Sequence, residues 1–290
     1  MVSEYKGHVM TRFLFFILLL FAIPVQAHPP VSIVIDSRGN VFYSDLEQVW
    51  MIAPDGSKTI AVQHVHTHEL WIGPDDTLYG EDVANVGDSY RHRIWKRTPD
   101  GQIENELEWR EGHPDDFNDY SFARDASGLM YALVRSEKQI KILRDNEVIQ
   151  TIALDSHEGF VHWLIVQPDG TIFLTIGKSL IQIKPGTTEG IVLANHLIER
   201  TPAFDFLHDR HALMGLWTDT KNNVYVSVFS GQQVKQISPD GIASVPFRQS
   251  GKWSITGGAI DSQGRVWLLE FSSDNQVRVR RIGQDEETIF

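Results

Sequence analysis

The stretch HVHTHELW, residues 64–71, places His64, His66 and His68 at every second position, with Glu69 directly after them. On an extended backbone this spacing points all three imidazole rings to one face. A neutral imidazole is both a metal ligand and a base, because it offers a nitrogen lone pair and its pKa lies near neutral pH. Rings two residues apart on a strand are separated by roughly 7 Å, so this stretch alone cannot close on one ion.

Ligands for a metal must therefore come from distant parts of the chain. We expect His68, His162 and His211 to bind a divalent metal, of the zinc or of the calcium and magnesium type, with His66 as a further ligand. Three imidazoles from separate strands leave a coordination position open, where the ion activates water or polarises a carbonyl. The alternative is that these histidines only hydrogen-bond neighbouring loop carbonyls, and for His64 we prefer that interpretation.

Other side chains complete a candidate catalytic set. Glu81, Asp82 or Asp119 is expected to act as base, as orienting acid or as a fourth ligand. Arg135 is suited to clamping a carboxylate or phosphate, although an ion pair with Glu137 or Asp119 is equally natural. Three aromatic residues are candidates for a pocket wall that binds substrate, or else for ordinary core packing: Tyr120, Trp163 and Trp253.

A repeated phrase shows which elements position these residues. Six times an apolar strand meets a polar turn and resumes as a β-rich strand, as in IVIDSRGNVFYS from Ile33 and LWTDTKNNVYVSV from Leu216. The first turn residues are Asp36, Pro74, Asp125, Pro168, Asp219 and Asp261. A second turn, often PDG, follows a third strand in each unit. Four short strands joined by tight turns describe one blade of a β-propeller.

The sequence therefore predicts an all-β protein, a six-bladed propeller with four antiparallel strands per blade, as a single domain over 28–290. No segment shows a convincing helical period, although 196–212 is a candidate for a helical turn. A conventional ring closure would pair a strand near Val31 with the last blade.

In a propeller the first strand of each blade lines the central channel. By the repeat, His68 precedes the inner strand of blade 2, His162 that of blade 4 and His211 that of blade 5. We expect these histidines to converge at one mouth of the channel. The acidic loop 108–120 is either a lid over this mouth or a solvated connection.

The repeat pattern resembles that of NHL-repeat propellers and of the wider group that contains the gluconolactonase and senescence-marker family, amidoglycolate lyases and streptogramin lyases. The resemblance covers the whole chain after residue 27 and implies the fold more strongly than any one function, since propellers host many activities. HELWIGPDDTLYGED in particular looks like a streptogramin-lyase repeat.

Each relative implies a different site. The gluconolactonase-like group implies a metal held by carboxylates and amides, but Pro30 stands where its first-blade glutamate would be, and only Asp119 matches in part. The amidoglycolate lyases imply three zinc-binding histidines on alternate blades; His68 and His162 match, and Trp253 lies where the third is expected. Streptogramin lyases imply a histidine base beside magnesium.

The N-terminal residues and the composition indicate where the protein acts and which partners it excludes. Residues 1–27 read as a cleaved export signal, because an apolar run from Phe13 to Val25 precedes Val25-Gln26-Ala27; no membrane span is expected after cleavage. A net charge of −12 without a basic block argues against nucleic-acid binding. Without cysteine there are no disulfides and no thiolate chemistry. We expect a monomer, exported to the periplasm or secreted.

Two functions of different classes follow. The first is a metal-assisted hydrolase or lyase that acts on a small molecule at the channel mouth. The second is a non-catalytic scaffold that binds a peptide, glycan or protein partner across the same face. We favour the enzyme, because burying several histidines without a ligand depresses their pKa values and costs stability.

Overall fold

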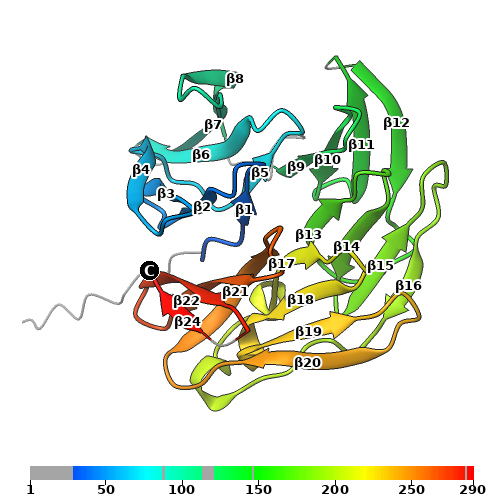
Figure 1. Cartoon of the computed structure of the whole chain (residues 1–290). Helices are drawn as coiled ribbons and strands as arrows, with labels where there is room; N and C mark the ends of the chain where they lie inside the picture. The colour runs from blue at the N-terminus through cyan, green and yellow to red at the C-terminus, as the bar shows by residue number, and fades with distance from the viewer. Residues whose placement is uncertain (1–28, 87–88, 113–120, 146, 285) are drawn as a thin grey trace, which may run out of the picture.

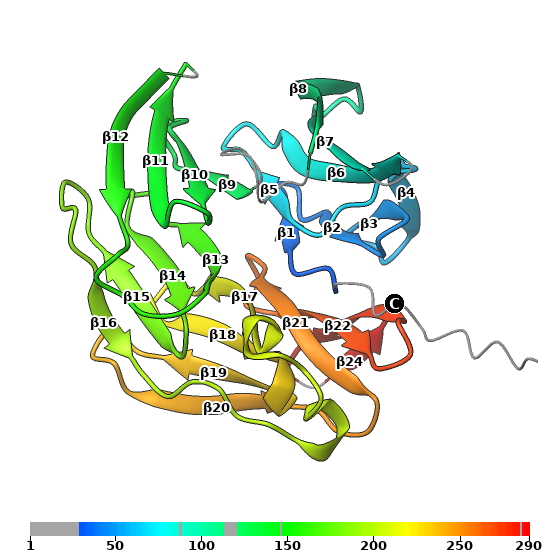
Figure 2. The same ribbon diagram turned by 180° about the vertical axis from the view of Figure 1, so that it is seen from behind.

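A computed structural model describes residues 29–86, 89–112, 121–145, 147–284 and 286–290. These residues form six antiparallel four-stranded sheets around a central axis (Figure 1), and the view from behind shows the same ring (Figure 2). The predicted six-bladed all-β propeller is confirmed. The predicted signal segment lies outside the described residues. Within those residues, the structure has no helix with the length and apolarity to cross a membrane.

Each blade consists of four strands that are consecutive in the sequence, the innermost first. In blades 1 to 3 they are β1 (Ile33–Ile35), β2 (Val41–Ser44), β3 (Gln48–Ile52), β4 (Lys58–Gln63); β5 (Leu70–Ile72), β6 (Leu78–Val86), β7 (Ser89–Arg97), β8 (Ile103–Glu111); β9 (Ser121–Arg124), β10 (Met130–Val134), β11 (Gln139–Arg144), β12 (Glu147–Ala153). In blades 4 to 6 they are β13 (Val161–Val166), β14 (Ile172–Ile176), β15 (Ser179–Ile183), β16 (Ile191–Ala194); β17 (Leu213–Thr218), β18 (Val224–Val228), β19 (Gln233–Ile237), β20 (Ala243–Arg248); β21 (Trp253–Ile260), β22 (Val266–Ser272), β23 (Val277–Ile282), β24 (Glu287–Ile289).

The repeated aspartate makes the turn between the first two strands of a blade. In four blades its Oδ1 atom accepts hydrogen bonds from the backbone N–H groups two and four residues further on, at 2.7–3.1 Å: Asp36, Asp125, Asp219 and Asp261. Such a local bond offers the backbone a turn in place of the sheet ladder. Tyr131 and Tyr225 also donate their hydroxyls to these carboxylates, which ties each turn to the second strand.

The ring closes by side-chain packing between complete blades. β1 pairs with β2 alone, so the predicted pairing of a strand near Val31 with the last blade is wrong. Instead, Ile33 and Tyr43 of blade 1 share one buried cluster with Trp267 and Leu269 of blade 6. The C-terminal Phe290 stacks on Trp267 at 5.5 Å between ring centroids. Blade 6 already has its fourth strand, β24, which leaves no place for an exchanged one.

We call the face at which the inner strands begin the mouth face. Two short 3₁₀ turns within the expected segment 196–212, η2 (Pro202–Phe204) and η3 (Asp209–His211), lie in the connection to β17. A third, η4 (Phe229–Gly231), follows β18. Phe204 and Leu207 pack with Val31 and Phe229 in one cluster, so this connection covers part of the mouth.

The backbone of Val31 is wedged against two inner strands. Its N–H donates to the carbonyl of His68 at 2.9 Å, and its carbonyl oxygen faces glycine α-carbons in β17 and β21. A Cβ atom built on Gly257 would lie 2.1 Å from this oxygen, and one on Gly215 would lie 2.5 Å from it. Only glycine permits so close an approach.

Gly257→Ala is therefore expected to lower the free energy of unfolding by about 1–3 kcal/mol, because the added methyl overpacks the channel against backbone atoms that cannot rotate away. Chemical denaturation followed by tryptophan fluorescence measures the change. An unchanged denaturation midpoint would show that the segment around Val31 is not wedged in solution.

Candidate functional site

The histidine stretch is a connection between strands. β4 ends at Gln63 and β5 begins at Leu70, and His64 has a left-handed backbone with φ of 56°. The expected strand alternation over these residues is therefore wrong. His66 and His68 nevertheless lie on one side, with ring centroids 4.7 Å apart in a T-shaped contact. His64 is exposed.

The side chain of Glu81, in β6, is hydrogen-bonded to the backbone of this connection. Its carboxylate is fully buried and accepts hydrogen bonds from the backbone N–H groups of His68 and Glu69. The Nδ1 atom of His68 lies 3.4 Å from Oε1 of Glu81. Burial raises the pKa of Glu81 to about 8 and lowers the pKa of His68 to about 4. The two side chains form a carboxyl–imidazole pair at the mouth face.

A second carboxylate of β6 fixes His66. The Oδ1 atom of Asp82 accepts from the backbone N–H of His66 at 3.0 Å, while Oδ2 pairs with Arg93. The Nδ1 atom of His66 lies 2.9 Å from the carbonyl oxygen of Leu46. Burial, with a smaller contribution from His68, lowers the pKa of His66. Glu81 and Asp82 thus determine the backbone path on which both histidines sit.

The ring of His162 contacts the connection that covers the mouth. Its ring nitrogens lie 3.1 Å from the carbonyl oxygens of Arg210 and of Gly177, and the side chain is buried. Burial lowers the pKa of His162 to about 4. In η3 itself, Nε of Arg210 donates to Nε2 of His211 at 2.8 Å. Both predicted ligands are thus engaged with the protein's own polar groups.

The predicted metal ligands are not brought together. Among the residues that the structure describes, no three histidine, aspartate or glutamate side chains are placed to share an ion. Each ring nitrogen of His162 already lies at hydrogen-bond distance from a backbone carbonyl oxygen, so binding a metal would break one of these two contacts. His68, His162 and His211 are therefore not placed to share one metal ion. Asp119 lies outside the described residues, so a metal that uses it stays a prediction.

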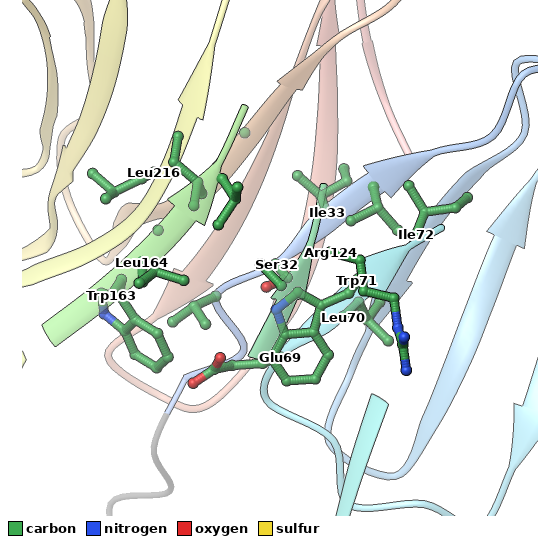
Figure 3. A pocket seen from close by; sticks show the side chains of 17 residues that line it. Ser32, Ile33, Glu69, Leu70, Trp71, Ile72, Arg124, Trp163, Leu164 and Leu216 are labelled. Carbon is green, nitrogen blue, oxygen red and sulfur yellow. The ribbon is translucent and has the colours of Figure 1, made fainter. Parts of the chain in front are cut away.

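A cavity of about 180 Å³ lies at the centre of the ring, between the inner strands. Glu69, Trp71 and Arg124 line it on the side of blades 2 and 3, and Trp163 lines it from blade 4 (Figure 3). Ile33 and Leu216 contribute an aliphatic wall. In the view of Figure 3, the Glu69 carboxylate lies between the two indole rings.

Arg135 connects three blades beside this cavity. It follows β10 of blade 3 and donates from Nη2 to the carbonyl of His162 at 2.6 Å and from Nε to that of Val161 at 3.2 Å. Nη2 also lies 3.4 Å from Oε1 of Glu69, and the guanidinium is 5.3 Å from the ring centroid of Trp163. The proposed partner Glu137 instead pairs with Lys141.

Of the three aromatic residues predicted to bind substrate, Trp163 lines the cavity and Trp253 does not. Trp163 lines the cavity and donates from Nε1 to the carbonyl of Leu213 at 3.2 Å. Trp253, at the start of β21, is covered by the guanidinium of Arg278 at 4.0 Å and is not among the residues that line the cavity. Tyr120 lies outside the described residues.

Among the cavity residues that sequence reasoning missed, Glu69, Trp71 and Arg124 carry a charge or an indole ring. The side chains of Glu69 and Arg135 are 6% and 10% exposed, so a charge pair is buried at the mouth. The signal for Glu69 was its position directly after His68 and before a three-residue apolar strand.

Comparison with known proteins finds similar solved structures with the same fold. No family model and no curated protein matches the chain. A solved structure of virginiamycin B lyase from Staphylococcus aureus is similar, with 13% identity, a TM-score of 0.56, and coverage of 91% of this chain and 84% of that one. A gluconolactonase from Xanthomonas campestris is similar at 13% identity and a TM-score of 0.55, with 87% and 86% covered. A protein of unknown function from Bacteroides thetaiotaomicron reaches a TM-score of 0.60 at 13% identity, with 91% and 71% covered. At this identity the likeness shows the shared propeller fold alone.

Proposed function

We propose that the protein is an acid–base enzyme, a hydrolase or lyase, that acts on a small organic molecule held in the central cavity. The observation that carries the proposal is the pair of Glu81 and His68, 3.4 Å apart, directly beside the cavity residue Glu69. A carboxyl group beside a nitrogen of an imidazole is the arrangement that turns histidine into an effective base. The export predicted from residues 1–27 is part of the same proposal.

Protonation decides which role His68 takes. Nδ1 faces Glu81, so Nε2 is the nitrogen that would act on a substrate. When Glu81 is protonated, it donates to Nδ1, and Nε2 carries the hydrogen of the neutral ring. When Glu81 is ionised, Nδ1 carries the hydrogen, and the Nε2 lone pair accepts a proton from the substrate. The base form therefore requires that Glu81 has lost its proton.

The neighbouring residues would position the substrate. Arg135 is fixed by two backbone carbonyls, so its guanidinium is already oriented before a ligand arrives. Trp163 offers a flat apolar surface on the other side of that guanidinium. Leu207 and Phe204 cover part of the mouth and reduce access of water.

The pH dependence of turnover tests this function. Because burial raises the pKa of Glu81 to about 8, the fraction in the base form increases as pH rises through that value. We expect kcat/KM toward a reactive member of a panel of esters, lactones and amides to increase between pH 6 and 9, with a midpoint near 8. A rate that is flat over this range, or no turnover of any panel member, would contradict the proposal.

A non-catalytic binding protein is the second candidate. Phe206, in the connection that covers the mouth, is 58% exposed and presents an apolar ring at the surface. A partner that docks there would not enter the cavity. Binding without turnover, undisturbed by substitution of the cavity residue Trp163, would favour this candidate.

A further inference from the structure

The segment that covers part of the mouth, residues 201–211, is held together by one side chain. The guanidinium of Arg200 donates to the carbonyl oxygens of Leu207 at 2.6 Å and of Asp205 at 3.3 Å. It also pairs with the carboxylate of Asp209 at 2.5 Å. A guanidinium has five N–H donors in a rigid fork, so it can serve several acceptors at once. We therefore expect this covering segment to move as one body.

Apolar packing places the covering segment against the wall of the central cavity. Phe204 and Leu207 belong to the same buried cluster as Val31, and Trp163 packs against that cluster. Val31 and Trp163 both line the cavity, and Trp163 is labelled in Figure 3. Movement of the covering segment away from the propeller would therefore expose this part of the cavity wall to solvent.

The imidazole of His162 is a second attachment, and the neutral form makes it a weak one. Nδ1 lies 3.1 Å from the carbonyl oxygen of Arg210 in the covering segment, and Nε2 lies 3.1 Å from that of Gly177, directly after β14. A neutral imidazole has one N–H group, and a carbonyl oxygen only accepts. One nitrogen therefore points its lone pair at a carbonyl oxygen, so His162 can donate to Arg210 or to Gly177 but not to both.

The surroundings of His162 disfavour a charge on its imidazole. The residue is 2% exposed, and the guanidinium of Arg135 donates to its backbone carbonyl at 2.6 Å. Among the described residues, the opposing charge is Asp209, whose pKa the hydrogen bond from Arg200 lowers, so this carboxylate stays ionised in mild acid. Burial outweighs the two carbonyl groups and lowers the pKa of His162 to about 4. The covered imidazole is therefore neutral at pH 7.

We propose that His162 is a pH-sensitive latch on the mouth: its neutral imidazole allows the covering segment to close, and protonation of that imidazole in mild acid releases the segment and opens the cavity wall at Val31 and Trp163. The charged imidazole is hydrated once the segment has moved away, whereas the closed form buries it beside Arg135. This inference names the regulation of the cavity and rests on the proposed function for one consequence, that a substrate gains access in acid.

The direction and the size of the effect follow from the two environments of the imidazole. An exposed imidazole has a pKa near 6.5, and covered His162 has a pKa of about 4. Protons therefore bind more tightly to the open form. The closed form is fully favoured above about pH 6.5 and becomes less favoured as pH falls toward 4. At pH 5 the ratio of open to closed molecules rises by up to about 30-fold over its value at pH 7.5.

Labelling of introduced cysteines measures the opening, because the natural chain has no thiol of its own. Leu207→Cys places a thiol where the side chain is 9% exposed, and Phe206→Cys places one beside it where the side chain is 58% exposed. Both full chains react with 4,4′-dithiodipyridine in the presence of a chelator, so that loss of a metal cannot cause a change. The Phe206→Cys rate divided by the Leu207→Cys rate gives the protection at each pH. We expect protection to fall about 5- to 30-fold between pH 7.5 and pH 5.

A buried position in the same blade distinguishes opening of the covering segment from unfolding of the whole chain. Leu174, in β14, is 0% exposed and lies outside the covering segment. The thiol of Leu174→Cys should keep its protection at pH 5, because the blade stays intact when the segment opens. An equal loss of protection at Leu174→Cys would assign the effect to acid unfolding and would exclude the latch.

Further variants identify which imidazole takes up the proton, since His208 and His211 also lie in the covering segment. His162→Gln, combined with Leu207→Cys, should remove the pH dependence whatever the protection at pH 7.5, because glutamine does not titrate. His208→Asn and His211→Gln in the same background remove the other imidazoles and keep a side-chain acceptor at each position. Both should retain the full loss of protection in acid.

The remaining outcomes contradict the inference. A Leu207→Cys thiol that is unprotected at pH 7.5 would show that the covering segment is not closed in solution. A loss of less than about fivefold, or a loss that survives in His162→Gln, would show that His162 does not control the segment. Failure of the proposed function looks different: the segment would open in acid as expected, yet no panel compound would be converted at any pH.

Discussion

Replacing His68 by alanine is expected to lower kcat/KM by about 10²–10⁴-fold, the usual contribution of a positioned general base. The imidazole lies 3.4 Å from a fully buried carboxyl group and directly precedes the cavity residue Glu69 in the sequence, whereas the neighbouring imidazole of His66 faces the carbonyl oxygen of Leu46. Single-turnover and steady-state measurements on the reactive panel compound give the change. Binding of that compound should change little, because cavity contacts come from Glu69, Trp71 and Trp163.

Glu81→Gln tests the partner of that base. The glutamine oxygen can still accept from the backbone N–H groups of His68 and Glu69, so the connection should keep its path. Glutamine does not ionise near pH 8, so the rise of kcat/KM through that pH should disappear along with much of the rate. A variant that keeps the rise would assign the titration to another group.

Two controls separate a base from a metal ligand. His64→Ala, four residues before His68 and exposed, should leave kcat/KM unchanged. Activity should also survive prolonged treatment with a chelator. If the chelator abolishes activity, zinc or magnesium restores it, and His68→Ala loses the bound metal, then His68 is a ligand and the metal predicted from the sequence is present.

Glu270→Gln is expected to lower the free energy of unfolding by about 3–5 kcal/mol, the largest stability effect that the structure predicts. Glu270 of β22 is fully buried and accepts from Nε of Arg278 at 2.6 Å and from Nε of Arg280 at 2.8 Å. Gln249 donates to the same carboxylate at 2.5 Å. Removing one negative charge leaves the two guanidinium groups of β23 with too little counter-charge.

Urea denaturation of the two proteins at pH 7 measures this effect. Glu286→Gln is the matched control, because Glu286 also pairs with an arginine of β23, Arg281 at 2.9 Å, but is 62% exposed. Solvent screens that pair, so the control should change stability by less than about 1 kcal/mol. A loss for Glu270→Gln no larger than that of the control would mean that Arg278 and Arg280 find other partners.

Glu81 and Glu270 show how the surroundings set the role of a buried carboxylate. Both are fully buried within the second strand of a blade, close to where the inner strand of that blade begins. Two arginines and an amide surround Glu270 and stabilise its charge. Glu81 meets backbone N–H groups and an imidazole, and burial raises its pKa. The first is suited to holding β22 and β23 together, and the second to exchanging a proton.

The fold was readable from the sequence because it is repeated. Asp36, Asp125, Asp219 and Asp261 each build their turn from atoms within four residues, so the turn forms wherever the local sequence occurs. Six turns between apolar strands, four of them built in this way, leave a propeller as the arrangement that buries every blade face. The repeat also assigns His68 and His162 to the mouth face.

Which of those residues meet depended on tertiary structure. The sequence paired His68 with His162 and His211, whereas the folded chain pairs it with Glu81, and it gives His162 to the carbonyls of Arg210 and Gly177. The ring closure by whole blades and the cavity residues Glu69 and Trp71 were also invisible. The reason is physical: a local pattern determines the direction in which a side chain leaves its strand. What it contacts depends on the path of a connection and on neighbouring blades distant in sequence, here the left-handed turn at His64 and the buried carboxylates of β6.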